Sequence, residues 1–148
     1  MRMAALYLNR YRIAAPSVPT PQRYHDLRKI CGLTPPQSDL VAVAAALPKT
    51  YHGVTIIDTE YSGVDGDEVI GMGRLVGDGT LFLLLTDVCV APEHQGKGIA
   101  RLIIEELVSH VDEHCPAAHI VLCGDPPVSD RMLFKFSWFS LVETLIVT

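Results

Sequence analysis

The chain has 148 residues, of which 49% are hydrophobic and 20% charged, and its formal net charge is -5. This length suffices for one hydrophobic core but is short for two ordinary domains, so we expect residues 1–148 to form a single domain. The hydrophobic fraction makes extensive disorder unexpected. Because the positive residues are scattered through an acidic chain, the sequence lacks the basic footprint that general nucleic-acid binding requires, and we expect no nucleic-acid partner.

The cysteine pattern and the N-terminus exclude further classes. The four cysteines fall at wide, unequal intervals without a C-x-x-C pair, so we expect structural thiols and no bound metal: Cys31, Cys89, Cys115 and Cys123. The N-terminus shows no charged-then-apolar stretch ending in a cleavage site, and the longest apolar run, at 81–85, is too short to cross a membrane. We therefore expect no membrane partner. We also expect a reducing compartment, which would be the cytoplasm or the nucleus, because these residues do not distinguish the two.

The N-terminal third is predicted to hold an edge strand and two helices. Alternating apolar residues indicate a strand before Pro16. Apolar residues at helical spacing indicate a helix over residues 22–30, which Gly32 ends. An alanine-rich segment indicates a second helix over 37–47, with Ser38 as its N-cap.

The middle of the chain is predicted to form a hairpin and a central strand. The β-branched residues at 54–57 and a turn at 64–67 lead into a second strand over 68–76. A turn at 77–79 then leads into residues 80–90, an almost wholly apolar run that suits a strand buried on both faces.

A strand–helix–strand unit is expected around this central strand. Apolar residues recur every three or four positions from Ile99 to Val111, which indicates an amphipathic helix. The apolar run at 119–123 follows that helix, so we expect it to lie parallel to the central strand through a right-handed crossover. A short helix over 129–135 and a last strand over 141–147 complete the chain. That last strand would pair either with the chain's own sheet or with another subunit.

The loop before the amphipathic helix has the features of an anion site. Backbone N–H groups at a helix start have no partner inside the helix, and the aligned peptide dipoles place partial positive charge there. Gly96 and Gly98 would let phosphate oxygens approach the main chain, while Lys97 and Arg101 would add positive charge. Two glycines alone are more typical of a simple tight turn. The residues around them are therefore needed to distinguish such a turn from a phosphate-binding loop.

Two other phosphate-binding motifs do not fit this loop. A Walker A loop requires glycine at position 91 and serine or threonine after the lysine, where Ala91 and Gly98 stand. The dinucleotide fingerprint requires a third glycine at position 101, where Arg101 stands. A P-loop and a Rossmann site are therefore disfavoured.

The segment from Gln95 to Ala100 resembles the cofactor motif of the GNAT superfamily of N-acetyltransferases. That motif reads Q/R-x-x-G-x-G/A and is met by Gln95, Gly98 and Ala100. The preceding residues 88–94 and the order of strands and helices are similar to the family over most of the chain. The resemblance implies an α/β fold of the mixed α+β kind with three layers. About four helices would flank a central, mixed, largely antiparallel β-sheet.

The resemblance also implies acetyl-CoA as the cofactor. The pantetheine would pair with main-chain groups of Val88, Cys89 and Val90. The pyrophosphate would lie against the N–H groups of Gln95, Gly96, Lys97, Gly98, Ile99, Ala100 and Arg101. The thioester would lie where the strands at 80–90 and 119–123 separate. The implied reaction is transfer of an acetyl group to a primary amine of a small molecule or peptide.

The expected general acid of this reaction is missing from the sequence. Many members of the family carry a tyrosine in a pattern like L-Y-x-K-x-G-F, which overlies residues 132–138 and puts Leu133 or Phe134 at the tyrosine position. General acid help is typically worth about a hundredfold to ten-thousandfold, so its loss would slow transfer without abolishing it. The alternative function is a weakly active or non-catalytic acyl-CoA-binding or regulatory module of the same family.

Asp87 is the first candidate for the general base, because it lies on the strand expected to line the cleft. An aspartate near a strand end is nevertheless more often a hydrogen-bond partner. Tyr51 and His52 are candidates for the cleft mouth, whereas His94 is expected to be structural or solvent-facing. Cys89 is expected to pack as a small hydrophobe, with an acyl-cysteine intermediate as a remote alternative.

The sequence names no particular acceptor amine. Acceptor selection is expected to fall to the first two helices, to the loop at 31–36 between them, and to the loop around Tyr61. These segments contain no acidic cluster of the kind that would bind a polyamine. A monomer and a homodimer are both compatible with the sequence.

Overall fold

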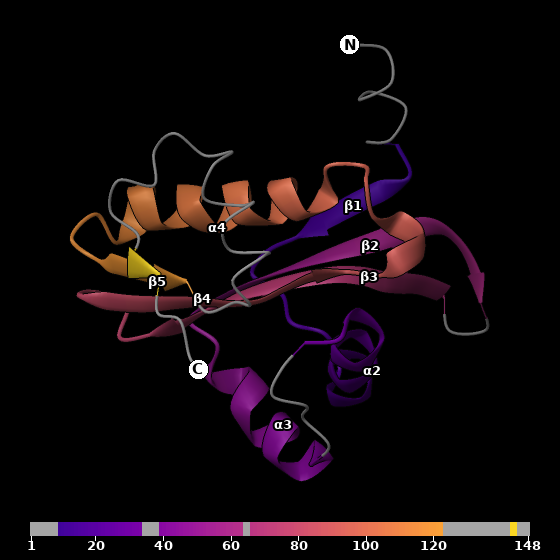
Figure 1. The fold of residues 1–148 in the computed structure, drawn as a ribbon, viewed down its shortest axis with the longest axis horizontal. Helices are drawn as coiled ribbons and strands as arrows, with labels where there is room; N and C mark the ends of the chain where they lie inside the picture. The colour runs from indigo at the N-terminus through magenta and orange to yellow at the C-terminus, as the bar shows by residue number, and fades with distance from the viewer. Residues whose placement is uncertain (1–8, 34–38, 64–65, 123–142, 145–148) are drawn as a thin grey trace.

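The computed structural model describes residues 9–33, 39–63, 66–122 and 143–144. Its elements in chain order are β1 (Tyr11–Ala14), α2 (Pro21–Cys31), α3 (Leu40–Ala46), the 3₁₀ helix η1 (Leu47–Lys49), β2 (His52–Gly63), β3 (Gly66–Gly77), β4 (Phe82–Val90), the 3₁₀ helix η2 (Pro92–His94), α4 (Ile99–His114), β5 (His119–Leu122) and β6 (Glu143–Thr144). Figure 1 shows three layers, with α4 on one face of the sheet and α2 and α3 on the other. The expected three-layer fold is confirmed.

The described strands form one sheet in the order β1 to β6. β1 to β4 pair antiparallel with their neighbours, whereas β4–β5 and β5–β6 are parallel. This arrangement confirms the mixed, largely antiparallel sheet and the parallel relation of the two apolar runs. The hairpin strands are longer than their β-branched and apolar stretches indicated, because the ladder between β2 and β3 extends from His52↔Leu75 to Gly63↔Gly66.

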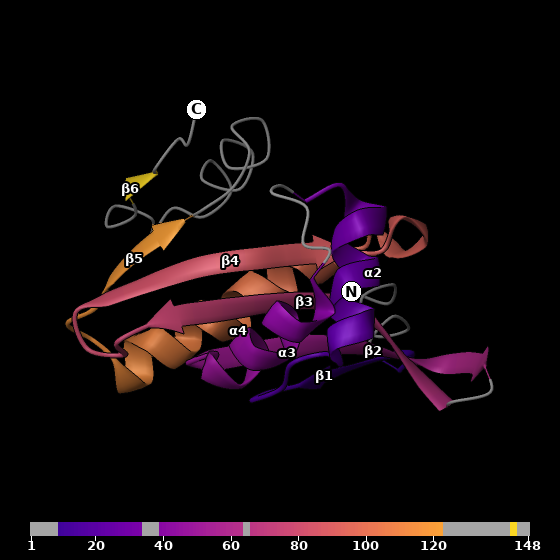
Figure 2. The same cartoon turned by 90° about the horizontal axis from the view of Figure 1, so that it is seen from below.

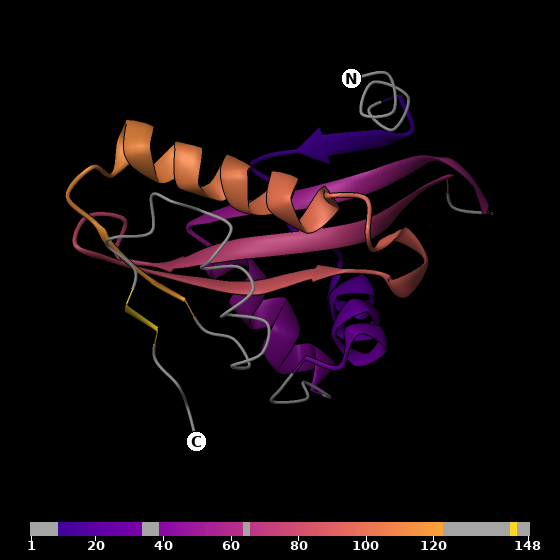
Figure 3. The ribbon, with the colours of Figure 1, turned by 45° about the horizontal axis from the view of Figure 1, so that its top comes forward.

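The central strand is less completely buried than its apolar sequence indicated. Leu83 and Leu85 are fully buried, but Leu84 and Thr86 are half-buried and the Phe82 side chain is 58% exposed. The reason is that α2 lies against only the C-terminal part of β4, as Figure 2 shows. On the other face α4 runs lengthwise along the strands (Figure 3). The prediction that β4 is buried on both faces was therefore wrong for its first half.

The helix ends follow the predicted chemistry, with one correction. The Thr20 hydroxyl accepts from the Arg23 N–H at the start of α2, and Gly32 ends that helix in the left-handed region at φ 67°. α3 begins at Leu40, later than predicted, and its N-cap is Asp39 rather than Ser38. The Asp39 carboxylate accepts from the N–H groups of Val41 and Ala42, the second and third residues of the helix, so it satisfies donors that the helix leaves open.

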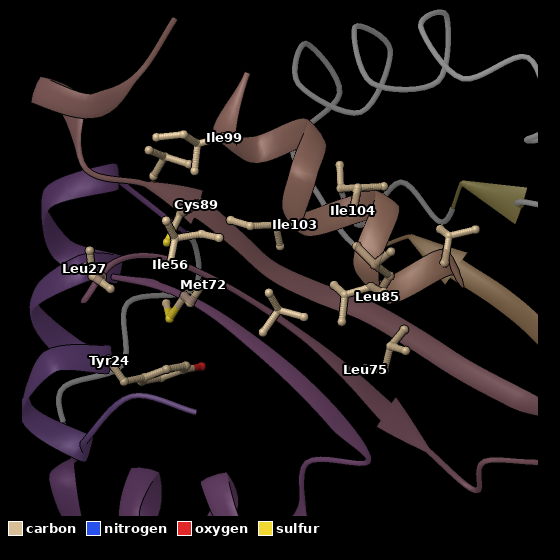
Figure 4. Close-up of a cluster of buried hydrophobic side chains, with 14 of the residues drawn as sticks. Tyr24, Leu27, Ile56, Met72, Leu75, Leu85, Cys89, Ile99, Ile103 and Ile104 are labelled. Carbon is tan, nitrogen blue, oxygen red and sulfur yellow. The ribbon is translucent and has the colours of Figure 1, made fainter. Parts of the chain in front are cut away.

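The core between α4 and the sheet requires glycine on β3. A Cβ atom added at Gly73 would lie 2.5 Å from Ile103 Cγ2 and 3.0 Å from Leu107 Cδ1. Figure 4 shows Ile103 pointing from α4 toward the strands among the buried side chains. Close approach of the helix to the sheet therefore depends on the missing side chain at this position.

Gly73→Ala is expected to lower the free energy of unfolding by about 1–3 kcal/mol, because the added methyl group overpacks this contact. Gly71→Ala is the matched control, since its added Cβ would meet its nearest neighbours at 3.3 Å and requires a smaller shift. Urea denaturation of both variants measures the difference. A Gly73→Ala protein as stable as the wild type would show that α4 does not pack on β3 as described.

Part of the C-terminal prediction lies outside the described residues. These are the helix at 129–135, most of the strand at 141–147 and the tyrosine-motif positions at 132–138. Of the last strand, Glu143 and Thr144 pair with Val121 and Leu122 of the chain's own sheet. Within the described ranges, every helix is too short or too polar to cross a membrane.

Candidate functional site

The loop between β4 and α4 turns through two glycines in the left-handed region. Gly96 has φ 75° and Gly98 has φ 80°, and Gly98 is the N-cap of α4. Left-handed φ values strain residues that carry a Cβ atom, so glycine fits both positions. The side chain of Gln95 folds back and donates from Nε2 to the Val90 carbonyl over 2.9 Å, which ties the loop to the end of β4.

The first turn of α4 presents open backbone donors. No side chain caps the helix, and among the described residues no acceptor receives a hydrogen bond from the N–H groups of Gly98, Ile99 or Ala100. A Cβ atom placed at Gly96 or Gly98 would meet nothing within 4 Å, so the space beside these two glycines is free of described protein atoms. Open donors with the positive end of a helix dipole are suited to a phosphate.

The two cations of the loop lie beside this helix start and already have partners. Lys97 Nζ lies 3.2 Å from the Tyr11 hydroxyl and 3.4 Å from the Glu93 carbonyl. Arg101 Nε donates to Glu105 over 2.7 Å on the exposed side of α4. Both side chains can add positive potential near the helix start, and an anion there would compete with these weak surface contacts.

Tyr11 of β1 holds the loop against the edge of the sheet, a role that no sequence pattern predicts. Its hydroxyl lies 2.8 Å from His94 Nδ1, and the two rings meet edge to face at 5.6 Å. His94 Nε2 in turn lies 3.9 Å from the Asp58 carboxylate. The expectation that His94 is structural or solvent-facing agrees with this packing. Tyr11 and His94 are far apart along the chain, so no local pattern predicts their contact.

A pocket of about 330 Å³ opens beside the loop. Most of the predicted cofactor residues line it, together with the end of α2: Val88, Cys89, Val90, Gln95, Gly96, Ile99 and Ala100 from the prediction, and Cys31, Leu33 and His94 in addition. Lys97, Gly98 and Arg101 do not line this pocket. Cys31 and Leu33 were not predicted as cofactor residues, because the loop motif carries no information about which helix end faces it.

The second half of β4 has no strand partner on its β5 side among the described residues. In the described part of the chain, β4 pairs with β5 only from Phe82↔His119 to Leu85↔Leu122. β4 itself continues to Val90, so its main-chain groups from Thr86 onward have no described strand partner on that side.

Asp87 lies at a β-bulge and is buried among three donors. β4 carries one extra residue where Met72↔Cys89 is followed by Arg74↔Thr86, and Asp87 there has φ 59°. Its carboxylate accepts from the Tyr24 hydroxyl over 2.8 Å, from Arg74 Nε over 2.7 Å, and from Arg28. Both carboxylate oxygens are therefore engaged.

This cluster joins α2, β3 and β4, and it also acts on Tyr24. Burial, and next the negative charge of Asp87, raise the pKa of the Tyr24 hydroxyl, so Tyr24 stays protonated and donates. With Arg28 and Arg74 both bound, Asp87 has the contacts of a residue that positions other groups. Its predicted role as general base is tested by no observation and stays a prediction.

Tyr51 and His52 do not lie at the mouth of this pocket. The structure places them at the other end of α4, where His52 stacks on His110 with ring centroids 3.7 Å apart and His110 stacks on His114 at 4.3 Å. The Tyr51 hydroxyl lies 2.9 Å from Cys115 Sγ. The prediction failed because the turn before β2 gave no information about which end of the sheet it occupies.

The histidine stack is expected to make the fold acid-sensitive. Burial, and next the neighbouring histidines, lower the pKa of His52, and the pKa of His110 is lowered in the same way. The unfolded chain therefore binds protons at a higher pH than the folded chain, and stability is lost as the pH falls through about 6.5. Glu106 and Glu113 face His110 and oppose this effect in part.

Urea denaturation at pH 7.5 and at pH 5.0 measures this loss. His52→Phe is expected to reduce the difference in the free energy of unfolding between the two pH values, because it removes a buried group whose protonation the fold disfavours. Val54→Ala, at a fully buried position of β2 that carries no titrating group, is the control: it should lower the free energy of unfolding at both pH values and keep the wild-type difference. An equal pH difference in wild type and His52→Phe would contradict the prediction.

Comparison with known proteins assigns the family of this loop and sheet. The sequence profile described as an acetyltransferase (GNAT) domain matches residues 52–127, just over half of the chain. The chain belongs to this family. The matched GNAT segment contains β2 to β5, the glycine loop and α4, which are the elements that build most of the pocket. The resemblance read from Gln95, Gly98 and Ala100 is confirmed.

Individual relatives agree with the GNAT assignment. The chain is 32% identical over 98 residues to "GCN5-related N-acetyltransferase 2, chloroplastic" of Arabidopsis thaliana, a match that covers 57% of this chain and 38% of that protein. The chain thus spans well under half the length of this curated relative.

Solved GNAT structures show the same fold. A probable acetyltransferase of meticillin-resistant Staphylococcus aureus superposes with a TM-score of 0.73 at 24% identity, covering 93% of this chain and 98% of that one. The family protein YhbS of Escherichia coli, solved in complex with CoA, superposes with a TM-score of 0.59 at 18% identity, covering 82% of this chain and 67% of that one. At these identities the likeness supports the architecture.

Proposed function

We propose that this chain binds acetyl-CoA at the start of α4 and transfers its acetyl group to a primary amine of a small molecule or peptide. The observation that carries the proposal is the uncapped helix start at Gly98, which opens beside a pocket in a GNAT fold. The Arabidopsis relative is named an N-acetyltransferase, and YhbS was solved with CoA, which supports the same ligand class here.

Different residues in and beside the pocket would bind different parts of acetyl-CoA. The amides of Gly98, Ile99 and Ala100 would hold the diphosphate, with Lys97 and Arg101 adding positive charge. The open edge of β4 at 88–90 would accept the pantetheine amides as a neighbouring strand does. Gln95 would hold the loop to β4 rather than contact the ligand, because its side-chain amide already donates to Val90.

The acceptor amine would enter from the face of α2 and α3. A second cavity of about 170 Å³ lies there, lined by Tyr24 and Arg74 together with Ala42, Val43, Ala46 and Leu47. Both Tyr24 and Arg74 also contact Asp87. The bulge at Asp87 would therefore lie between this cavity and residues 88–90 of β4, which are proposed to bind the pantetheine. The small volume and mostly apolar lining of the cavity suit a compact or apolar group next to the amine.

Bound acetyl-CoA supplies an activated thioester carbonyl, and the chain supplies orientation. The bulge at Asp87 fixes where β4 turns its backbone, and α2 is held to that point by two hydrogen bonds to one carboxylate. Holding two reactants in attack geometry can contribute a large part of the barrier reduction, which agrees with activity in the absence of the usual tyrosine. Removal of the amine proton stays assigned to Asp87 as a proposal.

The test is product formation from acetyl-CoA and a panel of primary amines, followed by mass spectrometry. The expected result is an acetylated amine that requires both the protein and acetyl-CoA and that is lost in a Gly98→Asp variant. Binding of acetyl-CoA without any acetylated product would instead support the alternative of a non-catalytic acyl-CoA-binding module. Failure to bind acetyl-CoA at all would reject both functions.

A further inference from the structure

Two cysteines that are far apart in the sequence meet in the wall of the CoA pocket. Cys31 is the last residue of α2 and Cys89 lies on β4, and both line the pocket beside the glycine loop. The Cys31 thiol is half-buried and donates to the Val90 carbonyl over 3.3 Å, whereas Cys89 is buried with 6% exposure. Both thiols are free. Their wide spacing along the chain does not predict that they line one pocket.

The two thiols are coupled, with unequal acidity. The neighbouring Cys89 thiol lowers the pKa of Cys31, and Arg23 acts in the same direction through its charge. The neighbouring Cys31 thiol, and next burial, raise the pKa of Cys89. The more exposed thiol is thus the better nucleophile, and the buried thiol lies next to it as a resolving partner.

We propose that Cys31 and Cys89 are a reversible oxidation site, and that their disulfide closes the CoA pocket at the end of α2. With hydrogen peroxide as oxidant, the Cys31 thiolate attacks a peroxide oxygen, the O–O bond breaks, and the departing hydroxide takes a proton to form water. Cys31 becomes a sulfenic acid. The Cys89 sulfur then attacks the Cys31 sulfur and loses its proton, and the hydroxyl leaves as a second water. In sum, two thiols and one peroxide give one disulfide and two waters.

The effect on the ligand rests on the proposed function of this pocket. Cys31 and Leu33 form one wall, and Cys89 and Val90 form the adjoining strand wall. A disulfide requires the two Cβ atoms to lie within about 3.5–4.5 Å, so it fixes the end of α2 against β4. The oxidised chain is expected to bind CoA about tenfold more weakly than the reduced chain. Reduction by dithiothreitol should restore the affinity.

The experiment uses a Cys115→Ser, Cys123→Ser background, so that only the two pocket thiols can react. After treatment with hydrogen peroxide, intact mass is expected to fall by two hydrogen atoms, and a digest should contain a reducible peptide that links Cys31 to Cys89. Bound acetyl-CoA should slow this reaction, because it covers the pocket. Cys31→Ser and Cys89→Ser in the same background should each block the loss.

Three outcomes would overturn the proposal. The first is no loss of mass in the background protein, the second is only an adduct or a higher oxide on a single cysteine, and the third is a disulfide between two chains. The disulfide assay does not depend on CoA, so its failure leaves the proposed function untouched. A disulfide that forms without changing CoA affinity, measured by calorimetry on both forms, would overturn the pocket-closing part.

Discussion

Gly98→Asp is expected to weaken CoA binding at least about 100-fold, which corresponds to about 2.7 kcal/mol. The substitution places a carboxylate at the N-cap of α4, where an added Cβ atom meets nothing within 4 Å and where the diphosphate is proposed to lie. Like charges brought together at a binding site cost several kcal/mol. Isothermal titration calorimetry with CoA measures the loss directly.

Gly98→Asn is the matched control for this variant. Both replacements put a side chain of nearly the same shape at φ 80°, so they share the backbone strain of the left-handed region, which asparagine and aspartate tolerate best among L-residues. Only the aspartate brings a negative charge. Equal CoA affinities for the two variants would show that charge at this helix start is irrelevant, and that the diphosphate lies elsewhere.

Asp87→Asn is expected to lower the free energy of unfolding by about 3–5 kcal/mol. The substitution keeps the shape of the side chain but removes the negative charge that compensates Arg28 and Arg74, whose side chains are 8% and 11% exposed. Removing one partner of a buried ion pair is strongly destabilising because it leaves buried charge without compensation. Urea denaturation at pH 7.5 measures the effect.

Tyr24→Phe separates the charge of Asp87 from its neutral hydrogen bond. It removes the donor that lies 2.8 Å from the carboxylate and leaves both arginines paired, so the expected loss is only about 1 kcal/mol. The account of the cluster would be wrong if Asp87→Asn lost no more stability than Tyr24→Phe. If Asp87→Asn remained stable but lost only turnover, the result would favour the role of general base.

The sequence predicted the parts of the fold that depend on local spacing. The repeat from Ile99 to Val111 predicted α4, because one helix face must carry the residues that pack on the sheet. The motif residues Gln95 and Gly98 predicted the loop, because left-handed glycines and an uncapped helix start are local properties. Gly32 likewise marked the end of α2 correctly.

What the sequence did not predict depends on contacts between distant segments. Tyr24 and Asp87 are 63 residues apart, and the Asp87 cluster forms only because a bulge in β4 turns the side chain toward α2. The pairing of Cys31 with Cys89 depends on the same packing of α2 against β4. Tyr11 anchors the loop across 83 residues. No periodicity in one segment carries information about such partners, so these contacts required the structure.

The most direct test of the central claim is a crystal structure of the chain with CoA. The account predicts that the diphosphate oxygens accept hydrogen bonds from the N–H groups of Gly98, Ile99 and Ala100, with the pantetheine running along β4 from Val90 toward Asp87. A CoA molecule bound elsewhere, with these three amides facing solvent, would contradict it.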